Sequence, residues 1–512
     1  MNKYILKTVM CSALAVATLT SCELDQYPDS ALVTEQSWQK LSDAENYNNG
    51  ILAYIRSLSS GATSVSEVQA DLFNLRASSV TNYQSYMWTF TNTQFDGDGL
   101  WSGSYTAIAN ANNVINNIDK VKTTNDSDKK MLEHYKGNAL FLRAYALFLR
   151  AYALSNMAPR YCSRYTTDEE AKTIKGLPLL TEVDVNKKPS RASLYDTYQF
   201  IMNDLQQARK LMDDVDNTDY TTMSSNVAEA LQARVLLYMN KHQEALDTVA
   251  DLLTRYQLTD DADAYKEMWK TDAIDFGSEL IYEPQMTADD RANFGSLYNY
   301  RYKQNNHVFY QPDYLPTQGL IDLYSDDDIR KIGTFFKAEE EDTSEPVIIT
   351  AGDVMSEGVV FNKYPGNSSL TKAGESFDFY NMSKPFRTAE LYLIGAEASY
   401  HLDGTDGGYL KRLQQARGFT TNIATGVALF NNIKDEWIRE FVGENFRLYN
   451  LKRWGDGFKR MQPQDGLEEG ILNVEGVKDF SISADNQRWN WEIPSQELQA
   501  NPNIERNWGR DN

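Results

Sequence analysis

Apolar residues recur along much of this chain at the three- and four-residue spacing of an amphipathic helix. In the segment RTAELYLIGAEASYHL, Leu391, Ile394 and Ala398 share one helical face. In IKDEWIREFVGENFRLYNLKRW, Trp437 and Phe441 begin a second apolar stripe that runs on into the tetrapeptide LYNL, while charged side chains mark the other faces. The pattern predicts two long helices near the C-terminus.

Helical hairpins are predicted in the N-terminal half. Within residues 226–258, Ala233, Leu236, Ala245 and Val249 keep the 3, 9 and 4 spacing of a tetratricopeptide helix pair. An alanine-rich stretch that precedes them would allow close helix–helix approach. Other hairpins recur at irregular intervals, which leaves two interpretations: a helical-repeat scaffold with insertions, which we favour, or a bundle of unrelated helices.

The texture of the sequence changes between about residues 260 and 385. Glycine, asparagine, aspartate and tyrosine become frequent, the helical period fades, and β-like runs occur at 345–351 and 358–364. We therefore predict a mainly α fold of tetratricopeptide-like hairpins, with a loop-rich second region that carries minor β structure. The expected division is a helical region at 22–258, followed by the loop-rich region and C-terminal helices at 259–512.

The first residues have the features of a targeting segment. Lys3 and Lys7 precede a short apolar run, which ends in Leu-Thr-Ser directly before Cys22. That order is typical of a bacterial lipoprotein signal peptide over residues 1–21, after whose removal Cys22 carries lipid, palmitate included. No apolar run of 18 residues follows Cys22, so the lipid is the expected membrane anchor.

Composition narrows the expected chemistry. The formal net charge of −22 argues against nucleic-acid binding, which needs a basic surface. Of the 3 cysteines, Cys11 would leave with the signal peptide and Cys22 would take the lipid, so Cys162 remains alone. Because one cysteine would remain, we expect no disulfide within the chain. Because the chain also has only 4 histidines, widely spread, we expect no metal site, and we expect no cofactor.

Charged residues inside the C-terminal helices need an explanation. Glu390 and Glu397 share a helical face, and Arg387 lies one turn before Glu390. Two carboxylates are also what a glycosidase uses, but we favour an ion-pair network that fixes helix docking. Its predicted members are Arg387, Glu390, Glu397, Arg417, Arg439, Glu444, Arg447 and Arg453. The acidic run before Arg330 lacks the spacing of an EF-hand and predicts a solvated turn with Arg330 paired locally.

Four motifs carry a family resemblance. R-x-x-E-L-Y-L-I-x-A-E-A begins at Arg387, and E-x-x-R-E-F-x-G-E-x-x-R-x-x-x-L-K-R-W-G ends at Gly455. W-x-x-x-Y-x-x-I-x-x-A-N begins at Trp101, and W-x-I-P-x-x-E-x-x-x-N-P lies in the tail. Together they resemble the SusD/RagB family, the surface nutrient-binding lipoproteins of Bacteroidota. Trp437 replaces a usual Arg and Asn445 a usual Gly, and we expect both to affect the ion-pair network rather than a ligand site.

The resemblance implies binding rather than catalysis. Such proteins lie on the outer-membrane surface like a lid over a SusC-like TonB-dependent transporter, and they pass captured oligosaccharide or polysaccharide to it. We therefore expect a lipid-anchored, surface-exposed glycan-binding protein that is not an enzyme. Two alternatives stay open: a peptide-binding member of the same fold and a lipoprotein glycoside hydrolase.

Rings beside amides are the groups expected to bind sugar, because a pyranose presents an apolar face and a hydroxyl rim. The resemblance points to two ring-rich stretches. The first offers Asn82, Tyr83, Tyr86, Trp88 and Asn92, and the second offers Tyr298, Asn299, Tyr300, Tyr302, Phe309 and Tyr310. Core packing is the alternative role for each ring. Trp88 is predicted at the surface, because small polar residues rather than aliphatic ones follow it.

Overall fold

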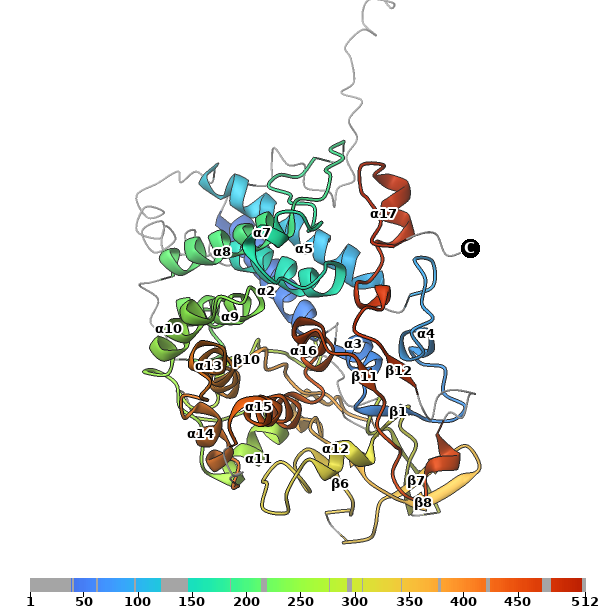
Figure 1. Ribbon diagram of the computed structural model, residues 1–512. Helices are drawn as coiled ribbons and strands as arrows, with labels where there is room; N and C mark the ends of the chain where they lie inside the picture. Colours follow the sequence, from blue (N-terminus) through green and yellow to red (C-terminus); the bar gives the residue numbers. More distant parts are fainter. Residues whose placement is uncertain are drawn as a thin grey trace, which may run out of the picture.

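A computed structural model describes residues 38, 41–60, 63–95, 98–120, 146–184, 186–212, 219–275, 277–291, 297–305, 307–341, 343–375, 379–419, 424–471 and 480–508. The signal peptide predicted at residues 1–21 and the lipidation site predicted at Cys22 lie outside these ranges. The described architecture is mainly helical with short strands (Figure 1), which confirms the predicted fold class.

The larger helices are α2 (Leu41–Ser60), α5 (Asp98–Asn117), a helix over residues 146–161, α8 (Leu194–Leu211), α9 (Ser225–Tyr238), α10 (His242–Leu252), α11 (Ala262–Thr271), α13 (Thr388–Asp403), α14 (Tyr409–Ala416), α15 (Gly426–Phe441) and α16 (Arg447–Trp454). Segments far apart in sequence pack together. α9 packs against α8 and α10, and α10 packs against α13, which also contacts α14 and α15. Figure 1 shows this order as green helices lying beside brown ones.

The helix pair predicted from the tetratricopeptide spacing is α9 and α10. All four of its marker residues are buried, Ala233, Ala245 and Val249 completely. The turn between the helices contains Asn240 at φ 56°, a left-handed conformation that asparagine tolerates better than most residues. Its side-chain amide donates to the Tyr165 carbonyl at 2.9 Å, which ties the turn to a neighbouring segment.

The second long C-terminal helix predicted from the apolar stripe is in fact two helices. α15 ends at Phe441 and α16 begins at Arg447. Between them Gly443 has φ 77° and Asn445 has φ 72°, two left-handed residues that interrupt the helical hydrogen bonds. The periodicity continued across this break because both helices bury apolar side chains, Trp437 and Phe441 in one cluster and Leu448 and Leu451 in another.

Most of the described strands lie in the loop-rich region. A four-stranded sheet has the order β3 (Arg301–Gln304), β4 (His307–Tyr310), β7 (Ile348–Ala351) and β8 (Val354–Glu357). The two-stranded pairs are β1 (Phe73–Leu75) with β5 (Tyr314–Pro316), β2 (Leu280–Tyr282) with β10 (Phe386–Arg387), β6 (Phe336–Lys337) with β9 (Val360–Phe361), and β11 (Phe458–Lys459) with β12 (Ser481–Ile482). The two predicted β-like runs correspond to β7 and β9.

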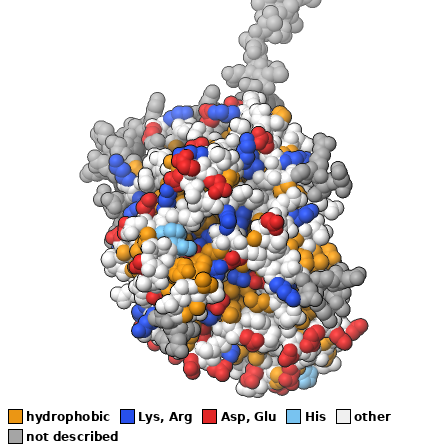
Figure 2. All heavy atoms as spheres, in the orientation of Figure 1, with side chains coloured by type: hydrophobic (Ala, Val, Ile, Leu, Met, Phe, Trp, Pro, Cys, Tyr) orange, Lys and Arg blue, Asp and Glu red, His pale blue; other side chains and the backbone are white. Residues whose placement is uncertain are grey.

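Short helices complete the described secondary structure. They are α3 (Thr63–Gln69), α4 (Tyr83–Tyr86), α7 (Asp168–Ala171), α12 (Gln318–Asp322) and α17 (Ser495–Ala500), with 3-10 turns η1 (Ile118–Lys120), η2 (Ser368–Leu370), η3 (Glu468–Gly470) and η4 (Gln487–Trp489). Across the described ranges, no helix has both the length and the apolar content to span a membrane. Figure 2 shows acidic side chains gathered along the lower edge of the molecule, over the loop-rich region.

Candidate functional site

A fully buried cluster of charges joins the C-terminal helices to the loop-rich region. Arg330 Nη1 donates to Glu436 Oε1 at 2.7 Å and to Glu440 Oε2 at 2.8 Å. Glu440 also accepts from Arg387 Nη1 at 2.6 Å and from Arg417 Nε at 3.0 Å. Burial raises the pKa of Glu440, but the three guanidinium groups outweigh it and hold that pKa well below its usual range. Glu440 therefore ties four separate chain segments together.

The residues predicted to form one network all take part in ion pairs, but they do not form a single network, and several partners differ from those expected. Glu390 pairs with Arg234, which the sequence did not indicate, and Glu397 pairs with Arg453. The remaining pairs are Arg387 with Glu440 and Glu444, Arg417 with Glu279 and Glu440, Arg439 with Glu436, and Arg447 with Asp71.

The solvated turn expected before Arg330 is confirmed only in part, because Asp326 and Asp327 are exposed but Asp328 and Arg330 are buried. Asp328 is 4% exposed and Arg330 is fully buried, and the two side chains form a bidentate pair. The local pair was expected, but its burial was not, because Glu436 and Glu440 lie more than a hundred residues later in the chain.

Glu390 and Glu397 do not face a common cavity. Glu390 is held by both donors of the Arg234 fork, and Glu397 accepts from Arg453 and from the indole nitrogens of Trp437 and Trp454. Burial raises the pKa of Glu397, but Arg453 more than offsets it, so the carboxylate stays ionised. Two saturated carboxylates in separate pairs support a structural role rather than acid–base catalysis.

Most of the first predicted ring cluster is packed into the interior. The Trp88 side chain is 5% exposed, donates from Nε1 to the Gln69 carbonyl at 2.8 Å, and packs edge-on against Trp489 at 4.9 Å between ring centroids. Tyr86 is fully buried beneath the Arg460 guanidinium at 3.6 Å. The surface position expected for these two rings is therefore wrong, because distant residues cover them. Asn82, Tyr83 and Asn92 are half-buried.

The second cluster is divided between the two faces of the β3–β4 hairpin. Tyr310 is fully buried and packs with Val308 against the apolar residues beneath the sheet. Tyr302 and Phe309, directly opposite each other across the strands, lie on the other face and stack at 5.5 Å with 24° between ring planes. This division follows from the alternation of side chains along a strand.

Other members of the second cluster also have different environments. Tyr298 is 4% exposed within an apolar cluster, and Asn299 is 2% exposed and donates to Asn362 Oδ1 at 2.8 Å. These two, like Tyr310, cannot present their side chains to a surface ligand, contrary to expectation. Tyr300 is 45% exposed, and it precedes β3 directly.

Two further residues of the hairpin were missed by the sequence reasoning. Gln304 and His307 are opposite each other across the strands and share the face of Tyr302 and Phe309. Both are exposed, so they add an amide and an imidazole beside the stacked rings. The two-residue alternation from Tyr300 to Gln304 was the signal that could have found them. Within the described ranges, no three His, Cys, Asp or Glu side chains are grouped so as to hold a metal ion.

Comparison with known families decides the assignment. Residues 182–509 match the family model described as the SusD family, which is more than half of the chain. The chain belongs to the SusD family. Residues 23–237 also match a second model of this family, described as starch-binding and associating with the outer membrane. No curated protein matches the chain in sequence.

Solved structures share the SusD fold with this chain. A SusD superfamily protein from Bacteroides thetaiotaomicron is similar with a TM-score of 0.72 and 22% identity, over 92% of this chain and 100% of that one. A laminarin-binding SusD-like protein gives 0.67 and 20%, over 92% and 100% of the two chains. Surface glycan-binding protein A from Bacteroides thetaiotaomicron gives 0.67 and 16%, over 92% and 99%.

The two departures from the SusD pattern have physical explanations. Trp437 donates from Nε1 to Glu397 Oε2 at 3.0 Å and so belongs to the ion-pair network, as expected. Asn445 adopts φ 72°, a conformation in which the usual glycine is free of strain. Its backbone N–H donates to Glu67 at 3.1 Å, but its side chain also lines a cavity, so the expectation that it affects the network alone was incomplete.

Proposed function

We propose that this protein captures oligosaccharide or polysaccharide on the outward face of the β3–β4 hairpin. The observation that carries the proposal is the stacked pair of Tyr302 and Phe309, beside exposed Tyr300. Membership of the SusD family supports a glycan ligand, as do the laminarin-binding and glycan-binding names of two structures that share the fold.

The hairpin has the two kinds of group that sugar recognition needs. Stacked rings provide an apolar surface for the C–H groups of a pyranose, while exposed Gln304 and His307 provide hydrogen-bond partners for its hydroxyls. β3 is the outer strand of its sheet, so a ligand can approach this face from the side. A long glycan would gain affinity by contacting several rings in turn.

Delivery to a membrane transporter is the second part of the proposal. The lipobox-like sequence ending in Cys22 supports a lipid anchor, and the resemblance to SusD/RagB proteins supports a SusC-like TonB-dependent partner at the outer membrane. We further propose that the protein binds without hydrolysing its ligand, since the in-helix carboxylates are held in ion pairs.

The ligand class can be tested with purified wild-type protein on native gels that contain laminarin, starch, pectin or casein. We expect retarded migration in at least one polysaccharide gel and unchanged migration with casein. Reducing-sugar release from the same polysaccharides should stay at the level of a protein-free control. Retardation by casein alone would favour the peptide-binding alternative, and released sugar would favour the hydrolase.

The anchor can be tested by replacing Cys22. Cys22→Ala, expressed without the transporter, should leave the protein unprocessed or released from the outer membrane, because the proposed lipid is its anchor. Cys162→Ala is the matched control and should fractionate like the wild type. Membrane flotation followed by immunoblotting measures both variants. Continued flotation of Cys22→Ala would contradict the proposal.

A further inference from the structure

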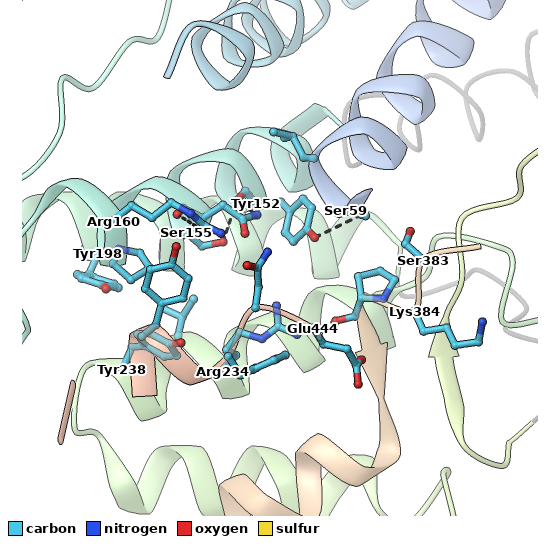
Figure 3. A pocket seen from close by; sticks show the side chains of 18 of the residues that line it. Ser59, Tyr152, Ser155, Arg160, Tyr198, Arg234, Tyr238, Ser383, Lys384 and Glu444 are labelled. Carbon is cyan, nitrogen blue, oxygen red and sulfur yellow. Dashed lines mark hydrogen bonds between the residues drawn. The ribbon is translucent and has the colours of Figure 1, made fainter. Parts of the chain in front are cut away.

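A partly enclosed cavity of about 100 Å³ lies between the helix over residues 146–161 and α9, away from the β3–β4 hairpin. Figure 3 shows Arg160, Ser155 and Tyr152 reaching into it from one helix and Arg234 and Tyr238 from the other. The rest of its wall combines hydroxyl and amide groups with apolar and charged side chains. A volume of this size holds several water molecules or a solute of a few heavy atoms.

The charges that line the cavity are not balanced. Arg234 on one side is neutralised by Glu390, at 2.7 Å from its Nη2. Lys384 pairs with Asp272, and Glu444 pairs with Arg387 and with Lys363. Each of these three lining charges is therefore compensated by a residue outside the cavity wall.

Arg160 is the exception. Its side chain is 3% exposed, and no carboxylate among the described residues forms an ion pair with it. Its guanidinium stacks on the Tyr449 ring at 4.5 Å and donates to the Asn156 carbonyl, but Nε has no hydrogen-bond partner within the described chain. A buried cation without a counter-charge is costly.

The positive charge of Arg160 also affects a neighbouring lysine, Lys452, by lowering its pKa. Lys452 is buried and donates to the Pro159 and Cys162 carbonyls at 2.7 and 2.6 Å. Burial lowers the pKa of Lys452 to about 7, and the charge of Arg160 acts in the same direction. Arg160 thus lies in a region where an added negative charge would be stabilising.

We propose that this cavity binds a small carboxylate whose oxygens pair with Arg160. The planar guanidinium fork matches a carboxylate in shape and charge. The carboxylate has two possible sources, a free acid of a few atoms or the acid group of a uronic-acid sugar. The proposal is independent of glycan binding at the hairpin.

The test is ¹⁹F NMR of difluoroacetate with the full mature chain in chloride buffer. We expect saturable binding at one site, with displacement by acetate. Arg160→Gln should weaken binding by roughly tenfold or more, as expected for losing a charged hydrogen-bond pair. Arg412→Gln, which removes a half-exposed guanidinium that pairs with exposed Asp260, is the matched control and should bind like the wild type. Displacement by acetate alone identifies a free acid, and displacement by galacturonate as well identifies an acidic sugar.

A second variant keeps the proposal testable if Arg160→Gln unfolds. Arg160→Lys keeps the positive charge at the buried cavity wall but removes the planar fork. It should still weaken difluoroacetate binding, because an ammonium group cannot form the paired hydrogen bonds of a guanidinium. Non-saturable broadening with the wild type, or equal affinity in a folded Arg160→Gln or Arg160→Lys variant, would overturn the proposal.

Discussion

Two regions of the chain place aromatic rings among polar residues: the loop around Trp88, and the β3–β4 hairpin. The rings of the two regions pack against different neighbours. Trp88 packs against Trp489 and Phe458, which come from the C-terminal part of the chain. Tyr302 and Phe309 pack against each other, on the face of the sheet that points away from the apolar cluster around Tyr310.

Whether each ring is buried or exposed depends on whether distant segments of the chain cover it. A loop ring becomes part of the core when distant segments fold over it, and polar residues next to it in sequence do not prevent this. The Trp88 indole even finds a hydrogen-bond acceptor there, the Gln69 carbonyl. A strand ring is exposed or buried according to its parity, because alternate side chains point to opposite faces.

The largest expected effect is on the buried ring. Trp88→Ala should lower the free energy of unfolding by about 3–5 kcal/mol, because it leaves a cavity next to Trp489. Tyr300→Ala, at an exposed ring, should lower it by less than about 0.5 kcal/mol. Urea unfolding followed by circular dichroism measures both. Equal effects would remove the contrast between the two regions.

The same contrast can be tested on charges. Glu397→Ala should cost about 3 kcal/mol of unfolding free energy, because it strands Arg453 and two indole N–H groups in the interior. Asp260→Ala removes the exposed pair with Arg412 and should cost about 0–1 kcal/mol. Thermal melts of the two variants at one pH provide the comparison. A Glu397→Ala protein as stable as Asp260→Ala would show that the buried network contributes little.

A half-buried histidine pair gives an intermediate case. His242 on α10 and His401 on α13 stack at 4.4 Å, and Glu397 lies 3.9 Å from His401 Nε2. Burial and the neighbouring His401 lower the pKa of His242 to about 4, and burial lowers the pKa of His401 as well. Between about pH 6.5 and pH 4 these two imidazoles therefore bind more protons in the unfolded chain than in the folded chain.

The stabilisation that this pair contributes should accordingly be fully present above about pH 6.5 and be lost as pH falls through this window. We expect a loss on the order of 1 kcal/mol, because solvent screens half-exposed rings. His242→Phe should remove this loss from the pH profile, whereas His307→Phe on the exposed end of β4 should not. Urea unfolding at pH 7, 6, 5 and 4 measures the slopes, and parallel profiles for wild type and His242→Phe would contradict the account.

Local pattern was sufficient for most helices and for part of the site. The spacing around Ala233 and Val249 predicted the α9–α10 pair, and strand parity could have separated Tyr302 from Tyr310. What could not be predicted were partners that only the folded chain brings together. Glu440 meets Arg330, Arg387 and Arg417 from three segments, and nothing near any one of them in sequence indicates the others.

Two kinds of local information were misread for physical reasons. The polar residues that follow Trp88 are exposed or half-buried while its ring is buried, so they say little about the ring itself. The apolar stripe through Phe441 continued past the end of its helix, because left-handed Gly443 and Asn445 end that helix while the next helix buries apolar side chains of its own in another cluster. The division of the chain near residue 258 remains a proposal from sequence texture.

A small effect on stability is also expected at the hairpin. Tyr302→Ala should cost about 0.2–1 kcal/mol of unfolding free energy, the range for one cross-strand pair. The same change should weaken glycan affinity far more, because the ring would be a direct contact. Urea unfolding beside a binding assay on the same protein separates these effects. A large loss of stability would mean that the pair serves mainly to hold the sheet.

Calorimetric titration tests the central claim most directly, with the polysaccharide that retards the wild type most on native gels. Tyr302→Ala combined with Phe309→Ala should weaken binding by roughly 1–3 kcal/mol, the range for aromatic hot spots. Trp88→Phe, which keeps a ring in the buried position, should bind like the wild type. Unchanged affinity in the hairpin variant, or weakened affinity in Trp88→Phe alone, would contradict the assignment of the glycan site to the β3–β4 hairpin.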